Sequence, residues 1–186
     1  MKLFTLIFFS FLILSCNSSK EKEGEQSDSI VSLKNEIKTN EDNISALSVS
    51  GATLQQIDSS RGVLVKSLIN FYKLYPTDEF APVCLDRVHF SYSAERKYEL
   101  AAMFADTLLL KYPDYINRAM LLESQANTFD MLIVPRDTSK VRYYSELLIK
   151  ENPELPKEKV SDIEFRLDNL ELTIEEIMEM QLEELN

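Results

Sequence analysis

The sequence is short of the residues on which most catalytic and cofactor sites depend. Its 186 residues include no tryptophan, one histidine, two cysteines and three scattered glycines. Without clustered glycines the chain has no glycine-rich phosphate loop. With only one histidine, His89, a serine–histidine–acid triad or a zinc site would have to be built on that residue. These shortages predict a protein that is not an enzyme and that needs no cofactor, metal ion or small-molecule substrate.

Two cysteines, Cys16 and Cys84, are too few for a disulfide scaffold. Cys84 is expected to be a free thiol. It precedes His89 by five residues, which is about 140° around a helix, so the two side chains do not share a face as metal ligands would. We expect His89 to pack against its neighbours or to be half-exposed rather than to act chemically.

Positive charge is also scarce. The chain has 20 Lys and Arg against 31 Asp and Glu, a formal net charge of −11, which repels nucleic acid and anionic membrane surfaces. A hydrophobic content of 45% with few glycines and six prolines is typical of a folded, helical protein. Length and composition together predict one all-α domain and no nucleic-acid partner.

The only long apolar run lies at the start. Residues 3–14, LFTLIFFSFLIL, follow Lys2 and form a stretch of twelve residues. This stretch is too short to span a membrane, which takes about 20 residues, but it suits a signal peptide. Ile13, Leu14 and Ser15 then lead into Cys16.

Residues 13–16 resemble the lipobox of bacterial lipoproteins. The resemblance implies that residues 1–15 are a signal peptide and that cleavage precedes Cys16. It further implies diacylglycerol on the Cys16 sulfur and an acylated amino terminus, so palmitate is an expected modification. Several acyl chains together give stable membrane attachment. An ordinary secretory signal with an incidental cysteine, or a short buried helix, is the alternative.

Residues 16–27 contain no large apolar group and are expected to form a flexible tether. Asn17 stands where an aspartate commonly retains lipoproteins in the inner membrane. This favours the outer membrane, on its periplasmic face or at the cell surface. The stretch SKEKE resembles the surface-export signals of Bacteroidota-type lipoproteins, although a solvated spacer would have the same composition.

Three prolines mark a repeated unit. Pro76, Pro113 and Pro153 each follow an apolar helix end and a basic residue, and they are spaced by 37 and 40 residues. A period of about 20–50 residues is typical of solenoids, and proline ends a helix. Each period is therefore predicted to hold two antiparallel helices. First helices are expected at 79–93 and 115–131, and second helices at 95–111 and 138–151.

The unit resembles the tetratricopeptide repeat, which implies a short tetratricopeptide-like solenoid of antiparallel helix pairs. The repeat positions fall on Leu85, Val88, His89, Tyr92, Tyr98, Ala101, Ala105, Leu108 and Pro113, then on Leu122, Gln125, Ala126, Phe129, Val141, Ser145, Leu148 and Pro153, with a half-unit at Leu64, Leu68 and Phe71. The second unit contains three inserted residues. His89, Gln125 and Ala105 depart from the family pattern. An unrelated helical bundle with chance Tyr-Pro marks is the alternative.

Capping helices are expected on both sides of the repeats. Residues 28–48 and 52–75 should supply leading helices, and the stretch from Pro156 should supply two closing ones, so that the tetratricopeptide-like helical domain spans 28–186. Glutamates gather near the end, at Glu175, Glu176, Glu179, Glu183 and Glu184. They suit a solvated helix face, and a site for a cation or a basic partner is the alternative.

The order of lipobox, acidic tether and repeats is similar to tetratricopeptide lipoproteins of Bacteroidota-type bacteria. It is also similar, more distantly, to the helical lipoprotein of the β-barrel assembly machine and to the Tol-Pal coordinator protein. The resemblance implies a lipid-anchored, non-catalytic adaptor that binds other envelope proteins. An accessory subunit of an outer-membrane assembly or secretion machine is the nearest alternative, and a wall-bridging structural protein or an envelope hydrolase is a more distant one.

The register of the repeat predicts which residues line a binding groove. They lie on the two first helices: Asp86, Phe90, Ser93, Glu123, Asn127 and Asp130. An aromatic anchor, Phe90, among carboxylates suits a partner segment that is basic and apolar by turns. The capping helices or an edge of the solenoid are the alternative docking surface.

Overall fold

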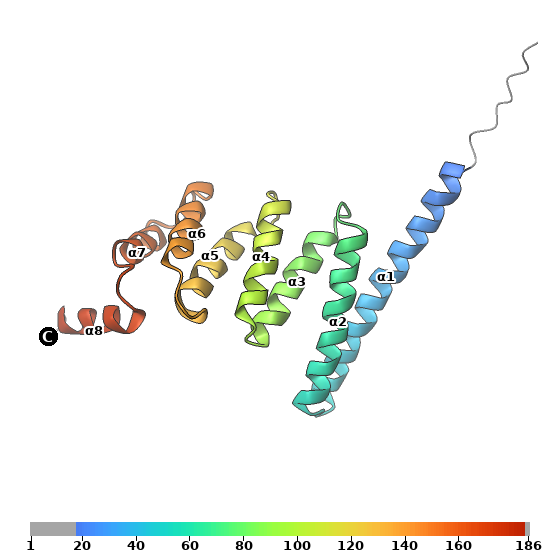
Figure 1. The fold of residues 1–186 in the computed structure, drawn as a ribbon, viewed down its shortest axis with the longest axis horizontal. Coiled ribbons are helices and arrows are strands. Elements are labelled where there is room, and N and C mark those ends of the chain that lie inside the picture. Colours follow the sequence, from blue (N-terminus) through green and yellow to red (C-terminus); the bar gives the residue numbers. More distant parts are fainter. Residues whose placement is uncertain (1–17, 185–186) are drawn as a thin grey trace, which may run out of the picture.

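A computed structural model describes residues 18–184 (Figure 1). Every regular element in this range is helical, with eight α-helices, one short π-helix and no strand. The all-α class expected from the sequence is confirmed. The signal peptide at 1–15 and the acylation site at Cys16 lie outside the described residues and stay predictions.

The helix boundaries agree with most of the expected spans. The elements are α1 (Ser18–Val49), α2 (Leu54–Leu74), α3 (Ala81–Ala94), α4 (Tyr98–Lys111), α5 (Arg118–Asn127), η1 (Thr128–Leu132), α6 (Thr138–Glu151), α7 (Lys157–Asp168) and α8 (Ile174–Glu184). The spans 52–75, 79–93, 95–111 and 138–151 match α2, α3, α4 and α6 to within three residues.

Two spans differ from the expectation. Residues 18–27, predicted as part of a tether, belong to α1 in the structure. Glu, Lys and Gln are strong helix formers, and an established helix extends with little further cost. The helix expected at 115–131 is α5 followed by the π-helical turn η1. Such turns interrupt regular α-helical bonding, and this one directly precedes the loop that holds the three inserted residues.

The second helix of each unit ends at a proline mark. Tyr75, Tyr112 and Asn152 are the C-cap residues of α2, α4 and α6, and each precedes a proline. Their φ angles are −131°, −130° and −128°, and their ψ angles are 59°, 73° and 70°. Proline disfavours the α conformation for the residue before it. One local cause therefore ends all three helices in the same way.

Side chains also fix two helix starts. Thr53 and Gln56 form a capping box at α2, in which Gln56 N donates to Thr53 Oγ1 at 3.3 Å and Thr53 N donates to Gln56 Oε1 at 2.9 Å. Asp137 accepts from the backbone of Lys140 at 3.1 Å at the start of α6. Such caps satisfy amide groups that have no partner within the helix.

The helices pack mainly on their neighbours in sequence and form a row, with α1 and α8 at opposite ends (Figure 1). Close packing joins α1 to α2 and continues pair by pair as far as α6 and α7. Within residues 18–184, no helix has both the length and the apolar character needed to cross a membrane.

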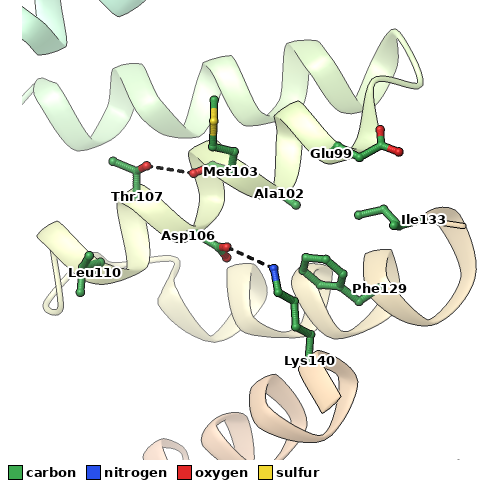
Figure 2. Close-up of a pocket in the computed structure, with 9 residues that line it drawn as sticks. All are labelled: Glu99, Ala102, Met103, Asp106, Thr107, Leu110, Phe129, Ile133 and Lys140. Atoms are coloured by element: carbon green, nitrogen blue, oxygen red, sulfur yellow. Dashed lines mark hydrogen bonds and ion pairs between the residues drawn. The ribbon is translucent and has the colours of Figure 1, made fainter. Parts of the chain in front are cut away.

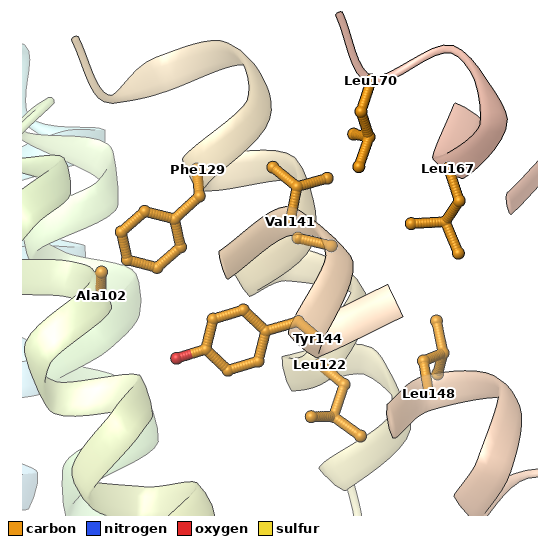
Figure 3. Close-up of a cluster of buried hydrophobic side chains, with 9 residues drawn as sticks. Ala102, Leu122, Phe129, Val141, Tyr144, Leu148, Leu167 and Leu170 are labelled. Atoms are coloured by element: carbon orange, nitrogen blue, oxygen red, sulfur yellow. The ribbon is translucent and has the colours of Figure 1, made fainter. Parts of the chain in front are cut away.

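Most of the repeat positions are buried. The buried members are Leu64, Leu68, Phe71, Leu85, Val88, His89, Ala101, Ala105, Leu108, Leu122, Gln125, Ala126, Phe129, Val141, Ser145 and Leu148. Tyr92 and Tyr98 are half-buried. Figure 3 shows the part of the core where Phe129 and Tyr144 lie between Ala102 of α4 and Leu167 of α7. The repeat positions therefore lie mainly in the core.

Candidate protein-binding surfaces

Ion pairs join helices that are not neighbours in sequence. Arg87 of α3 contacts Glu41 of α1 at 2.5 Å, and Lys159 of α7 contacts Glu123 of α5 at 2.6 Å. Between α3 and α5 the described residues form no ion pair. Within the described residues, no pair of opposite charges therefore bridges the surface between α3 and α5.

Asp130 is enclosed by cations of the protein itself. Both of its carboxylate oxygens accept from Arg166 of α7 at 2.7 Å, and Arg136 Nη1 lies 3.5 Å away. Arg136 in turn donates to the carbonyl of Leu172 at 2.7 Å and to that of Leu170. Asp130 thus positions Arg136, and Arg136 holds the chain between α7 and α8 through its hydrogen bonds to these carbonyls. The carboxylate of Asp130 is already engaged, which differs from the partner-binding role predicted for it.

Five of the six predicted groove residues line one of two clefts. Glu123, Asn127 and Asp130 line a cleft of about 230 Å³ between α5 and α7, whereas Asp86 and Phe90 line another between α3 and α5. Ser93 lines neither cleft. Lys159 and Arg166, which neutralise the first cleft, were missed from the sequence, although both lie 36 residues after the carboxylates that they contact.

Asp86 makes its contact with a tyrosine rather than a cation. Tyr115, in the loop before α5, donates its hydroxyl to Asp86 at 2.8 Å. Burial and this hydrogen bond to a carboxylate raise the pKa of Tyr115 to about 12. Tyr115 therefore stays protonated near neutral pH and keeps donating.

An apolar strip runs between α3 and α5. We define the α3–α5 strip as Val83, Phe90, Ile116 and Met120, which line two clefts of about 450 and 120 Å³. Phe90 is 57% exposed, Ile116 91% and Met120 65%. Sequence reasoning found Phe90 but missed the others. Met120 lies 37 residues after Val83, the same shift that relates the predicted groove residues, but neither residue was among those positions.

His89 packs beneath this strip. It is buried, its Nδ1 lies 3.1 Å from the carbonyl oxygen of Ala101, and its Nε2 lies 3.4 Å from Ser124 Oγ. A carbonyl oxygen can only accept, so Nδ1 carries the proton and Nε2 accepts from Ser124 when the ring is neutral. His89 joins α3, α4 and α5, as expected of a packing residue.

The other reactive side chain is equally enclosed. Cys84 is a free, buried cysteine, and burial raises the pKa of its thiol to about 12. A thiol of this pKa is almost fully protonated and unreactive at neutral pH. Within residues 18–184, no three His, Cys, Asp or Glu side chains are grouped so that they could hold a metal ion.

A further cleft of about 500 Å³ lies between α4 and the η1–α6 segment (Figure 2). Ala102 of α4 lies toward Phe129, and Met103 also lines the cleft (Figure 2). Lys140 lies 3.9 Å from Asp106 and 4.1 Å from the centre of the Phe129 ring. The cleft is thus largely apolar, with one ion pair across its middle.

Asp106, whose side chain is partly exposed, accepts hydrogen bonds from two buried side chains beside this cleft. It accepts from the hydroxyl of Tyr144 and from Nε2 of Gln125, which also donates to the carbonyl of Ala102 at 3.1 Å. Burial, followed by the bond to Asp106, raises the pKa of Tyr144. Gln125 Oε1 has no hydrogen-bond partner among the described residues.

In the acidic helix α8, the carboxylate of Glu176 has a defined structural role. Glu176 accepts from the backbone amide of Thr173 at 2.7 Å, while Thr173 Oγ1 accepts from the amide of Glu176 at 3.2 Å. The bond from the Thr173 amide lowers the pKa of Glu176. Glu176 thus caps α8, and Glu175 and Glu179 are exposed to solvent.

Comparison with known proteins finds no matching family model, no matching curated protein and no matching solved structure. The fold class, all-α, and the surfaces described above are therefore the basis for any statement about function.

Proposed function

We propose that this protein is a lipid-anchored, non-catalytic adaptor of the bacterial outer membrane, and that it holds a segment of another envelope protein on the α3–α5 strip. The observation that carries the proposal is the exposure of Phe90, Ile116 and Met120 beside adjoining clefts. Apolar side chains grouped at a cleft typically mark an interaction site. The predicted lipobox at Cys16 supports the anchor.

A tetratricopeptide-like solenoid is the second part of the proposal. Contacts recur at an offset of 36 residues, as between Glu123 and Lys159, between Asp130 and Arg166, and between the Tyr112 hydroxyl and the carbonyl of Pro76. The C-cap residues at the three proline marks share one conformation and recur after 37 and 40 residues. Repeated contacts of this kind support stacked helix pairs, in which each unit buries its face against the next.

The charges around the strip favour a partner segment with basic residues. Glu79 and Asp114 line the larger cleft together with one cation, Lys111, and none of the three has an ion-pair partner in the described part of the chain. Asp86 lines the smaller cleft, so carboxylates outnumber cations around the strip. The formal net charge of −11 adds long-range attraction for a basic segment. An apolar side chain would fill a cleft, and a Lys or Arg would lie against these carboxylates.

Co-purification from crosslinked membranes tests the proposal. Phe90→Asp places a charge in the strip, and we expect it to remove the partners that the wild-type protein retains. Leu54→Asp is the matched control, because Leu54 is also exposed and lies at the start of α2, where a carboxylate is tolerated. It should retain every partner.

Two results would contradict the proposal. If Phe90→Asp retains the same partners as Leu54→Asp, the strip does not hold them. If the wild-type protein retains no partner at all, it is not an adaptor. Circular dichroism of both variants checks that each remains helical.

A further inference from the structure

Tyrosine and proline side chains line the larger cleft of the α3–α5 strip. Tyr112, Pro113 and Tyr115 come from the end of α4 and the loop after it, and Pro82 comes from the first turn of α3. The cleft has a volume of about 450 Å³, and both tyrosines are half-buried. Tyrosine rings offer a large, rigid apolar surface, and a groove lined by aromatic rings is a common receptor for proline-rich segments.

The two tyrosine rings are held in place by the protein itself. The hydroxyl of Tyr112 donates to the carbonyl of Pro76 at 2.6 Å, and that of Tyr115 donates to Asp86 at 2.8 Å. Both rings also pack on buried side chains of α3, α4 and α5. The rings are therefore fixed before a ligand arrives, which reduces the ordering cost of binding.

The tyrosine pair is a property of this unit rather than of the repeat. The residue before each proline mark is Tyr75, Tyr112 or Asn152, and the second residue after it is Asp78, Tyr115 or Leu155. Only the mark at Pro113 has a tyrosine at both positions. Leu155 packs against the core as Tyr115 does, so an aliphatic side chain is enough for packing there. Packing of the repeat therefore does not explain both tyrosines.

The backbone around the cleft gives a ligand few groups to pair with. The amides of Tyr112 and Tyr115 already donate to carbonyls of their own chain at 3.0 and 3.1 Å, and Pro82 and Pro113 have no amide hydrogen. The described residues include no strand that a ligand could extend. A ligand amide covered by the tyrosine rings would lose its water partner, which is costly. Proline has no such amide, so a proline-rich segment avoids this cost.

Carboxylates flank the cleft. Glu79 and Asp114 line it and are exposed, and neither has an ion-pair partner in the described part of the chain. Lys111 is the one cation among the residues that line it. A polyproline II helix has three residues per turn, so basic residues at every third position lie along one edge while prolines face the rings. Such an edge matches the excess of carboxylates.

We propose that the larger cleft of the α3–α5 strip binds a proline-rich segment in the polyproline II conformation, with prolines against Tyr112 and Tyr115 and a Lys or Arg beside Asp114. This inference rests on the proposed function, because it names the chemistry of the segment that the strip holds. The charges involved are exposed, so added salt weakens the binding.

Fluorescence anisotropy with labelled peptides tests the inference on the full-length protein in detergent. A peptide of Pro-Pro-Lys repeats should bind. A peptide of Gly-Ser-Lys repeats with the same length and charge should bind roughly tenfold more weakly, because it has no proline rings and no preformed conformation. This comparison is needed because the net charge of −11 attracts any basic chain. A peptide of Ala-Ala-Lys repeats, which can form a helix, should also bind more weakly.

Asp114→Lys tests where the peptide lies. It should weaken binding of the Pro-Pro-Lys peptide roughly fivefold, because an attraction becomes a repulsion at an exposed site. Glu154→Lys is the matched control, since Glu154 follows Pro153 as Asp114 follows Pro113 and is also exposed. Both variants change the net charge equally, and the control should bind about as the wild type does.

Tyr115→Leu tests the ring. It introduces the residue that stands at the same position after Pro153, so packing is kept while one ring is lost. Binding of the Pro-Pro-Lys peptide should weaken several-fold. Circular dichroism checks that each variant remains helical.

Three results would each overturn the inference: no binding of the Pro-Pro-Lys peptide, equal binding of the Gly-Ser-Lys peptide, or equal binding by Asp114→Lys and Glu154→Lys. Tighter binding of the Ala-Ala-Lys peptide would show that the strip takes a helix instead. The crosslinking comparison of Phe90→Asp with Leu54→Asp separates these failures from that of the proposed function. If membrane partners depend on Phe90 and the Pro-Pro-Lys peptide does not bind, the strip holds a segment of other chemistry.

Discussion

Asp130 and Glu123 lie seven residues apart, and each carboxylate accepts from a cation of α7. Their surroundings differ. The side chains of Asp130 and Arg166 are 7% and 15% exposed, whereas those of Glu123 and Lys159 are 42% and 37% exposed. Removing one partner costs most when the remaining charge is buried, and an exposed pair contributes little.

The two carboxylates should therefore differ in their effect on stability. We expect Asp130→Asn to lower the free energy of unfolding by about 2–3 kcal/mol. The matched change Glu123→Gln should lower it by less than about 1 kcal/mol. Urea unfolding followed by circular dichroism measures both. If the two variants unfold alike, Asp130 has no special structural role and becomes a candidate partner-binding residue again.

His89 and Gln125 show which properties of a residue can be predicted from the sequence and which cannot. Both are buried and stand at positions of the repeat pattern, although their polar side chains depart from the residues that the pattern favours there. Their hydrogen bonds could not be predicted, because the partners come from α4 and are brought near only by packing. The α7 cations that pair with Glu123 and Asp130 were missed for the same reason.

The positions of whole helices could be predicted where a local feature of the sequence determines them. Proline ended α2, α4 and α6 where the sequence indicated, and hydrophobic spacing located α3. The interruption of α5 by η1 was not predicted, since the helical pattern continues through those residues.

One ion pair joins the start of α5 to the end of α6. Arg118 donates to Glu151 at 2.6 and 3.1 Å, and its Nη1 donates to the carbonyl of Leu109 at 2.7 Å. The hydrogen bond from Arg118 holds the pKa of Glu151 below its usual value of 4.5, although partial burial acts in the opposite direction. The unfolded chain, with the higher pKa, therefore binds the proton more readily.

This lowered pKa predicts how the contribution of Glu151 depends on pH. The stabilisation is fully present above about pH 4.5 and is lost as the pH falls through the lower pKa of the folded state. Glu151→Gln should be less stable than the wild type at pH 7, and the difference should shrink as the pH approaches 3. Urea midpoints across this range measure it.

Glu154→Gln is the control for this pair, because Glu154 is exposed and forms no ion pair within the described range. It should match the wild type at every pH. A stability difference for Glu151→Gln that is as large at pH 3 as at pH 7 would show that charge pairing between α5 and α6 is not its cause.

At the scale of the whole molecule, the helices form a row in which each packs mainly on its neighbours in sequence (Figure 1). The α3–α5 strip lies within this row, and the proposed lipid anchor at Cys16 would hold the row at the membrane.

The proposed anchoring would depend on one of the two cysteines, Cys16. The lipobox at 13–16 predicts that Cys16→Ala blocks lipid attachment, so that the protein either leaves the membrane fraction or keeps its signal peptide. Cys84→Ala is the control, because Cys84 is buried in the helical core and its loss should reduce stability without changing localisation. Membrane fractionation and metabolic labelling with a palmitate analogue measure both variants. If Cys16→Ala still fractionates with the outer membrane and still takes up the label, the lipid is attached elsewhere and the proposed anchor is wrong.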